Sequence, residues 1–309
     1  MRKTALIAIF ILAALALPAW AQTAADQTAL ATLTDPSLVK TPAKKLFGGM
    51  KLPANLKSNA IGFYAKGCLA GGQALPADGS AWEVMRPSRN RNWAHPAMIK
   101  LIERLATETK ANDGWNGLLV GDMSQPRGGP MLTGHASHQT GLDADVWLTP
   151  MPDRTLTKAE RENISATLVV RSRTEIDKKV WTEAHARLIK RAASYPEVAR
   201  IFVHPPIKAE LCKWATGDRS WLAKVRPYYG HNYHFHIRIE CPKGSTGCKN
   251  QPPARPKDGT GCGEELAHWM GDKPWTPKKK DPNAKPVKPA PPLTLAGLPA
   301  ECRAVVTAQ

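Results

Sequence analysis

After the apolar run from Ala5 to Leu17, the sequence contains no stretch of about 18 apolar residues, so no later segment is expected to span a bilayer. It also contains neither His-Glu-x-x-His nor Gly-x-Ser-x-Gly, which removes the key residues of a zincin and of a serine hydrolase. No Cys-x-x-Cys pair occurs, so a thiolate zinc site is not expected. Internal repeats and recognised nucleic-acid-binding modules are absent as well. Any metal site must therefore be built from histidines and carboxylates.

The N-terminus has the features of a secretory signal. Met1-Arg2-Lys3 is basic, the apolar run follows, and Ala19-Trp20-Ala21 fits a small-x-small cleavage site. No cysteine stands at the expected cleavage point, which argues against a lipid-anchored form. We therefore expect residues 1–21 to be removed as a signal peptide, and the mature chain to be a soluble protein of the periplasm.

Cysteine use agrees with export. The six cysteines all follow the signal: Cys68, Cys212, Cys241, Cys248, Cys262 and Cys302. An even number in an exported chain predicts disulfides, although the sequence alone leaves the connectivity open. Only the short Cys241–Cys248 spacing suggests a local bridge.

The chain is strongly basic, with a formal net charge of +17. This balance favours an anionic partner, such as nucleic acid, anionic lipid or an acidic cell-wall polymer. Export removes most of the case for nucleic acid. Part of the charge is local, because residues 271–292 are rich in proline and lysine and are expected to form an extended, solvated segment before a C-terminal segment at 293–309.

Periodicity gives a coarse view of the elements between these landmarks. Residues 22–60 are expected to be irregular with one short helix, and the basic residues 82–93 to be rich in turns. Helices are predicted at 96–108, 157–169, 181–194 and 207–214, and short strands at 118–120 and 199–203. This alternation, with a final strand hairpin, predicts an α+β fold: a single domain at 22–270 around a central antiparallel sheet.

Five of the nine histidines lie in two short stretches. In the second stretch, Tyr233, Phe235, Ile237 and Ile239 alternate with His234, His236, Arg238 and Glu240, which predicts a half-buried strand. Alternate residues point to the same face, so the two imidazoles should project together.

The first stretch contains His138 and Asp145. Gly134 and Gly141 interrupt regular structure around His138, and the alternation that begins at Asp143 predicts a loop that enters a strand. If the two stretches form neighbouring strands, His138, Asp145 and His236 come together. Two imidazoles and a carboxylate are ligands that Zn²⁺ accepts, with a fourth position left for water. The alternative is a buried, hydrogen-bonded polar cluster.

These motifs carry a family resemblance. His138-x6-Asp145 followed by His234-x-His236 resembles the paired signature of the LAS group of metallopeptidases. The sequence from Gly134 to Asp143 is similar to that of the penicillin-insensitive murein endopeptidases, peptidase family M74. Ile201-Phe202-Val203, Lys224-Val225-Arg226-Pro227 and the cysteine pattern extend the resemblance over nearly the whole mature chain.

The resemblance implies specific roles. His138, Asp145 and His236 would hold Zn²⁺, while His234 would take the proton of a water molecule or stabilise the oxyanion. The implied reaction is hydrolysis of the D-alanyl–diaminopimelyl cross-link of peptidoglycan. Since no serine acyl-enzyme forms, penicillin should not inhibit it. The resemblance further implies Cys68–Cys302 and Cys212–Cys262 disulfides beside Cys241–Cys248.

Several assignments stay open. His135 either binds a second metal or orients His138, and Asp143 is either an acceptor behind the ligands or a turn residue. His231 is either a polar wall or an active-site histidine. The arginines at 86, 89, 91 and 127 either grip substrate carboxylates or form a solvated face. The function itself has two rivals, a D,D-carboxypeptidase that trims terminal D-Ala and a non-catalytic zinc-binding domain that binds the wall.

Overall fold

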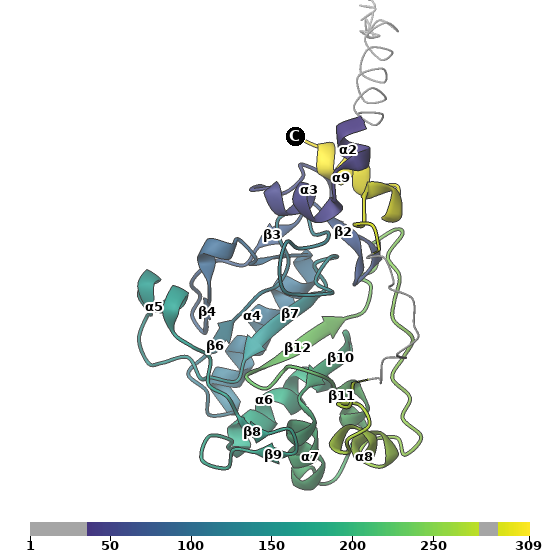
Figure 1. Cartoon of the computed structure of the whole chain (residues 1–309). Helices are drawn as coiled ribbons and strands as arrows, with labels where there is room; N and C mark the ends of the chain where they lie inside the picture. The colour runs from purple at the N-terminus through teal and green to yellow at the C-terminus, as the bar shows by residue number, and fades with distance from the viewer. Residues whose placement is uncertain (1–35, 278–289) are drawn as a thin grey trace, which may run out of the picture.

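A computed structural model describes residues 36–277 and 290–309 (Figure 1). The predicted signal peptide at 1–21 and most of the Pro/Lys-rich segment lie outside these ranges. Within them, every helix is too short or too polar to cross a membrane.

A mixed six-stranded sheet forms the centre of the molecule, in the order β11-β10-β12-β7-β6-β4. The strand bounds are β4 (Trp82–Val84), β6 (Leu118–Val120), β7 (Asp143–Trp147), β10 (Val198–Val203), β11 (Val225–Pro227) and β12 (His234–Ile239). The four inner strands are antiparallel, and each outer strand runs parallel to its neighbour. The predicted α+β class is confirmed. The expected final hairpin is wrong, because β10 lies between β11 and β12.

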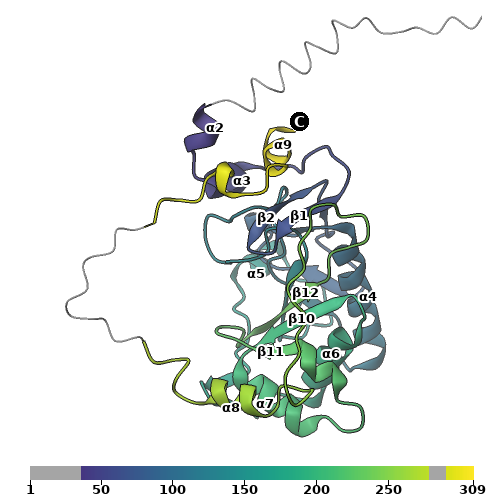
Figure 2. The same ribbon diagram turned by 90° about the vertical axis from the view of Figure 1, so that its right-hand side faces the viewer.

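Two long helices, α4 (Pro96–Asn112) and α6 (Glu183–Ser194), pack against one face of this sheet (Figure 2). At the start of α4, the His95 side chain accepts a hydrogen bond from the Ala97 N–H, and Pro96 occupies the first turn, where its missing N–H costs nothing. The predicted helix at 96–108 is confirmed by α4. The helix predicted at 157–169 is mostly wrong.

That helix, α5 (Lys158–Asn163), ends early because its continuation has other partners. The Arg86 guanidinium donates hydrogen bonds to the carbonyls of Arg161 and Ile164, at 2.7 and 2.6 Å. The Val169 N–H then donates to the carbonyl of Asn232, at 3.0 Å. Tertiary contacts therefore hold residues 164–169 extended where the apolar spacing indicated a helix.

The remaining elements are short: α2 (Pro36–Lys40), α3 (Ala43–Gly49), β1 (Asn59–Phe63), β2 (Lys66–Ala70), β3 (Gln73–Ala74), β5 (Trp93–Ala94), β8 (Val170–Ser172), β9 (Glu175–Ile176), α7 (Pro205–Trp214), α8 (Glu264–Met270) and α9 (Cys302–Thr307). The segment at 82–93, expected to be rich in turns, contributes β4 to the sheet and begins β5. Its Trp82–Val84 backbone pairs with β6, which no local pattern revealed.

A second, smaller core joins α3, β1, β2 and α9, which lie together at the top of Figure 1. The Cys68–Cys302 disulfide crosses it, linking residues 234 positions apart. Two further bridges, Cys212–Cys262 and Cys241–Cys248, belong to the larger core and its edge. These are the pairs that the family resemblance implies.

The alternation along β7 and β12 divides their side chains between two environments. Ala144 and Val146 of β7 join Phe235, Ile237 and Ile239 of β12 in the core beneath α4 and α6. The polar residues face the other way, yet they too are buried, so the prediction of a half-buried strand is only partly right. Tyr233 is outside the strand and 38% exposed.

Candidate active site

The register of β7 and β12 places the polar residues in cross-strand pairs. His236 lies opposite Asp145, and Arg238 lies opposite Asp143. His234 precedes them on the same face, opposite Trp147. The predicted neighbouring position of the two strands is therefore confirmed, and the pairing brings both histidines of the His-x-His motif to Asp145.

His138 reaches the same place from the loop before β7. Its backbone has a φ of 66°, a left-handed conformation that is uncommon outside glycine and that occurs at functional sites. Two hydrogen bonds stabilise this conformation: its N–H donates to Asp143 Oδ2 at 3.0 Å, and its ring Nδ1 donates to the Met123 carbonyl at 2.6 Å. Gly141 turns the chain back into β7 with a φ of 70°, where a Cβ would lie 2.8 Å from the His95 nitrogen.

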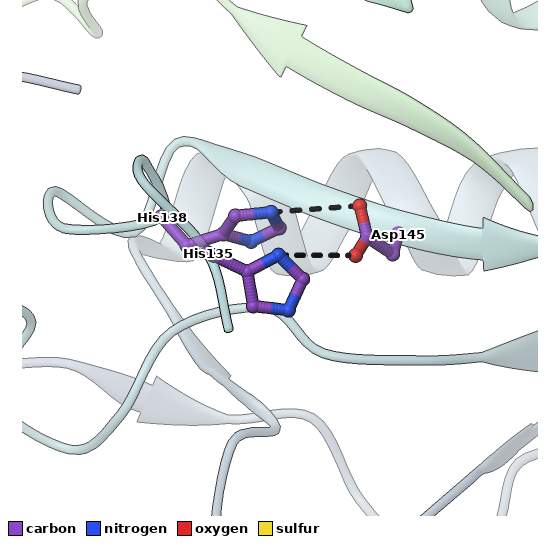
Figure 3. Close-up of side chains that lie close together, drawn as sticks. All are labelled: His135, His138 and Asp145. Atoms are coloured by element: carbon purple, nitrogen blue, oxygen red, sulfur yellow. Dashed lines mark ion pairs between the residues drawn. The ribbon is translucent and has the colours of Figure 1, made fainter. Parts of the chain in front are cut away.

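Asp145 is the centre of the cluster (Figure 3). Its Oδ1 lies 3.5 Å from His138 Nε2 and 3.3 Å from His236 Nδ1. Its Oδ2 lies 3.6 Å from Nδ1 of His135 and 3.6 Å from Nε2 of His234. Four imidazoles thus surround one buried carboxylate.

The three buried carboxylates of this region differ in their cationic partners. Asp122 pairs with Arg89 and Arg91, at 3.2 and 2.9 Å. Asp143 accepts from the Arg238 Nε at 2.7 Å. Asp145 has only imidazoles around it among the ion pairs of the described residues.

Neighbouring groups lower the pKa of all three carboxylates despite their burial. Burial alone would raise the pKa of Asp122, but its hydrogen bond with His135 and the two arginines lower it to about 2. Burial likewise opposes ionisation of Asp143 and Asp145, and the pKa of each is nonetheless lowered well below its ordinary value, by Arg238 and His236 for the former and by His234 and His138 for the latter. A buried anion without a cation is costly, so Asp145 marks a place for a positive ion.

The tautomers of three imidazoles follow from their outer partners. A carbonyl oxygen only accepts, so His138 Nδ1 carries a proton, and in the neutral ring Nε2 presents a lone pair to Asp145. His135 Nε2 donates to the ionised Asp122 at 3.0 Å, and His236 Nε2 donates to the ionised Asp143 at 2.8 Å. In the neutral form of each ring, Nδ1 then presents a lone pair to Asp145. For His236, burial lowers the pKa, but Asp143 and Asp145 raise it above its ordinary value. Such outer acceptors are typical of histidines that bind metal ions.

Buried polar atoms without hydrogen-bond partners also indicate a cation site at Asp145. His138 Nε2, Asp145 Oδ1 and His234 Nδ1 are buried without a hydrogen-bond partner. Buried polar atoms rarely remain unpaired, and lone pairs that face a carboxylate repel it unless a cation lies between them. His135, His138 and Asp145 place their ligand atoms within 4.8 Å of one another, a grouping that could hold a metal ion.

Burial favours the neutral forms of His234 and His231. Burial lowers the pKa of His234. Burial also lowers the pKa of His231, to about 3, and its Nδ1 donates to the Tyr229 carbonyl at 2.6 Å. The two rings lie 4.9 Å apart, so His231 adjoins the cluster without approaching Asp145 in any contact among the described residues.

A cavity of about 210 Å³ opens beside Asp145 and His234. Its wall includes Trp147, Tyr233, Arg86 and Arg89. Arg86 is committed to backbone carbonyls, whereas the Arg89 side chain is 49% exposed and gives one donor to Asp122. Arg89 therefore has donors left for a ligand in the cavity.

Arg127 neither faces the candidate site nor belongs to a solvated face. Its guanidinium is buried and donates to the carbonyls of Leu52, Val305 and Val306, at 3.1, 2.9 and 2.7 Å. It therefore binds backbone at the end of α9, and its donors are not available to a substrate.

Three features of the site were absent from the sequence prediction. Asp122 accepts from His135, the Met123 carbonyl orients His138, and Arg238 neutralises Asp143. The alternation of β12 could have revealed Arg238, because it shares a face with His236. Asp122 and Met123 follow β6, and only the sheet topology brings them to the histidines.

Comparison with known proteins identifies the family of this chain. The family model described as "Penicillin-insensitive murein endopeptidase" matches residues 60–307. A protein of that name from Haemophilus influenzae is 47% identical over 235 residues, covering 75% of this chain and 80% of its own. Those from Klebsiella pneumoniae and Escherichia coli are 38% and 39% identical, covering 87% and 84% of this chain and 92% and 95% of their own. This chain belongs to the family of penicillin-insensitive murein endopeptidases.

Proposed function

We propose that this protein is a zinc-dependent endopeptidase that hydrolyses D-alanyl–diaminopimelyl cross-links of peptidoglycan and is insensitive to penicillin. The observation that carries the proposal is Asp145, a buried carboxylate without a cation that faces the lone pairs of His138 and His236. These three residues are the proposed zinc ligands, since each imidazole has its other nitrogen held by an acceptor. Such a set leaves room for water, as in catalytic zinc sites.

A zinc ion held there would supply Lewis-acid polarisation of the scissile carbonyl and of a water molecule. His234 is proposed to accept the proton of that water and to pass it to the leaving amine, because burial favours its neutral form and it lies on the same face as the ligands. Asp143 is proposed to fix the tautomer and orientation of His236 through the Nε2 bond.

His135 and His231 receive separate proposals. His135 is proposed to be a further ligand or a hydrogen-bonding neighbour of the ligands, with Asp122 holding its proton at Nε2. His231 is proposed to line the site without binding the metal, because its nearest imidazole contact is His234 and its Nδ1 is engaged by Tyr229.

The cavity beside the cluster fits the chemistry of the proposed substrate. The scissile nitrogen of a D-alanyl–diaminopimelyl cross-link is attached to a carbon that bears a free carboxylate. Arg89 lines this cavity with guanidinium donors to spare, and Arg–carboxylate pairs are strong when bidentate. The net charge of +17 also favours an anionic polymer.

Location and organisation complete the proposal. Residues 1–21 are proposed to be a signal peptide that exports the chain to the periplasm, in agreement with three disulfides. Residues 22–270 are proposed to form the metallopeptidase domain. The segment at 271–292 is proposed to be a Pro/Lys-rich tail that starts with the turn held by Arg173 and Tyr229, followed by a C-terminal segment held by Cys302.

The deciding experiment is digestion of purified cross-linked muropeptide dimers, analysed by mass spectrometry, with and without chelator and penicillin. We expect dimers to become monomers, the reaction to stop in chelator and resume with added zinc, and penicillin to have no effect. Loss of only a terminal alanine would assign a D,D-carboxypeptidase instead. Bound zinc without any cleavage would indicate a wall-binding domain.

A further inference from the structure

Exposed aromatic side chains gather on one side of the candidate active site. Tyr228 and Tyr229, in the turn between β11 and β12, are 48% and 41% exposed. Trp269 of α8 and Trp275 beyond it are partly exposed and pack edge-on against Tyr229, each with ring centroids 4.9 Å away. We refer to these four residues as the aromatic platform.

Hydrogen bonds and an ion pair hold the aromatic platform in a defined arrangement. The Tyr229 hydroxyl donates to the Pro274 carbonyl, and the Trp275 indole donates to the Trp269 carbonyl at 2.9 Å. Arg173 holds the same turn by donating to the carbonyl of Met270 at 3.1 Å and pairing with Asp272 at 2.6 Å. The rings are therefore fixed in place before any ligand arrives, which lowers the entropic cost of binding.

A continuous series of rings joins the aromatic platform to the metal-binding cluster. His234 lies 4.9 Å from His231, His231 lies 6.1 Å from Tyr228, and Tyr228 lies 5.4 Å from Tyr229, measured between ring centroids. The chain between them supports this path, because His231 Nδ1 donates to the Tyr229 carbonyl. The platform is therefore linked to His234, and through it to Asp145, by a chain of neighbouring rings.

We propose that the aromatic platform binds the N-acetylated amino sugar to which the stem peptide of the substrate is attached. The inference rests on the proposed function. In a cross-linked stem the scissile bond lies at the fourth residue, and four extended residues span about 14 Å. The three ring-to-ring steps from His234 to Tyr229 are 4.9, 6.1 and 5.4 Å, so the Tyr229 ring lies no farther from His234 than their sum.

The chemistry of the platform fits a sugar better than a peptide carboxylate. The C–H face of a pyranose packs on aromatic rings, and tyrosine and tryptophan combine an apolar face with a polar tip. The stem peptide supplies no aromatic or large apolar side chain, whereas each sugar presents a flat apolar face. The platform thus selects cross-links that are still attached to glycan.

The test compares two substrates in the intact protein: cross-linked dimers that carry their disaccharides, and the same dimers after enzymatic removal of the sugars. For Tyr228→Ala we expect kcat/KM on the sugar-bearing dimer to fall about 5- to 10-fold, mainly through KM, with the sugar-free dimer changed by less than about twofold. Tyr228→Phe keeps the ring and should behave as the unmodified protein. Leu56→Ala, at a side chain 43% exposed and far along the chain, is the matched control and should affect neither substrate.

Other outcomes overturn the proposal. Equal losses on both dimers would mean that Tyr228 only supports His231, and no loss on either would mean that the platform touches no substrate. Increased activity on both would mean that the Tyr228 ring obstructs the substrate. A protein that cleaves neither dimer contradicts the proposed function; calorimetric titration with sugar-bearing, uncross-linked monomers then tests the platform alone, with weaker binding expected for Tyr228→Ala and equal binding overturning it.

Discussion

On the face of β7 and β12 that meets α4 and α6, the side chains are apolar and buried. On the opposite face, the same strands carry polar, titratable side chains beside Trp147, and these side chains are buried as well. The first face lowers the free energy of folding by removing apolar area from water. The second face costs desolvation, which Arg238 and the imidazoles offset for Asp143 but which no cationic side chain offsets for Asp145 in the described residues. One strand pair therefore supplies stability on one side and a site for a cation on the other.

Substitutions two residues apart on the polar face should separate metal binding from proton transfer. We expect His236→Ala to lose metal and activity together. We expect His234→Ala to keep about one equivalent of metal and to lose turnover by about 10²- to 10⁴-fold, the usual contribution of a general base. Metal analysis and kcat on muropeptide dimers check both. Equal metal loss in the two variants would overturn the division of roles.

A substitution on the apolar face should reduce stability and leave metal binding unchanged. Phe235→Ala removes a fully buried ring beneath the helices, and we expect it to lower the free energy of unfolding by about 3–5 kcal/mol. The folded fraction should still bind metal with unchanged stoichiometry, because Phe235 points away from Asp145. Denaturant titration and metal analysis of the folded protein measure the two effects. A Phe235→Leu variant, which leaves a smaller cavity, should lose less stability.

Substitution of Asp143 tests whether its hydrogen bond to His236 contributes to metal affinity. Asp143→Asn weakens the acceptor for His236 Nε2 and leaves the buried Arg238 without its anion. We expect metal affinity to fall about 10- to 100-fold, as for other partners behind metal-binding histidines. Competition with a chelator measures it. Asp153→Asn, at an exposed carboxylate outside the site, is the control and should bind metal normally.

The smallest effect concerns acid stability. The folded pKa of Asp122 is lowered to about 2 from an ordinary value of 3.8, so the folded state binds its proton less readily than the unfolded state does. Its contribution, about 2 kcal/mol, is therefore complete above pH 4 and is lost as the pH falls from about 4 to about 2. In protein treated with a chelator, Asp122→Asn should reduce the dependence of the free energy of unfolding on pH over this range. An unchanged curve, followed by circular dichroism, would refute it.

Local sequence was sufficient for some elements and misleading for others. The apolar spacing at 96–108 predicted α4, because an amphipathic helix packs with its own stripe of side chains. The same kind of spacing at 157–169 failed beyond Asn163, because Arg86 and Asn232 satisfy the backbone there in an extended form. β4 was missed because its three residues form a strand through pairing with β6, which is distant in the sequence.

The sequence by itself determined the family, the histidine and aspartate motifs and the side of each strand on which they project, because a period of two is a local property of the chain. The tertiary structure decided which nitrogen of each imidazole faces Asp145, since the Met123 carbonyl, Asp122 and Asp143 come from other segments. It also decided that Arg127 is structural and that Arg89 is open to the cavity. Proton positions and free donors depend on neighbours across the fold, and spacing along the chain does not contain them.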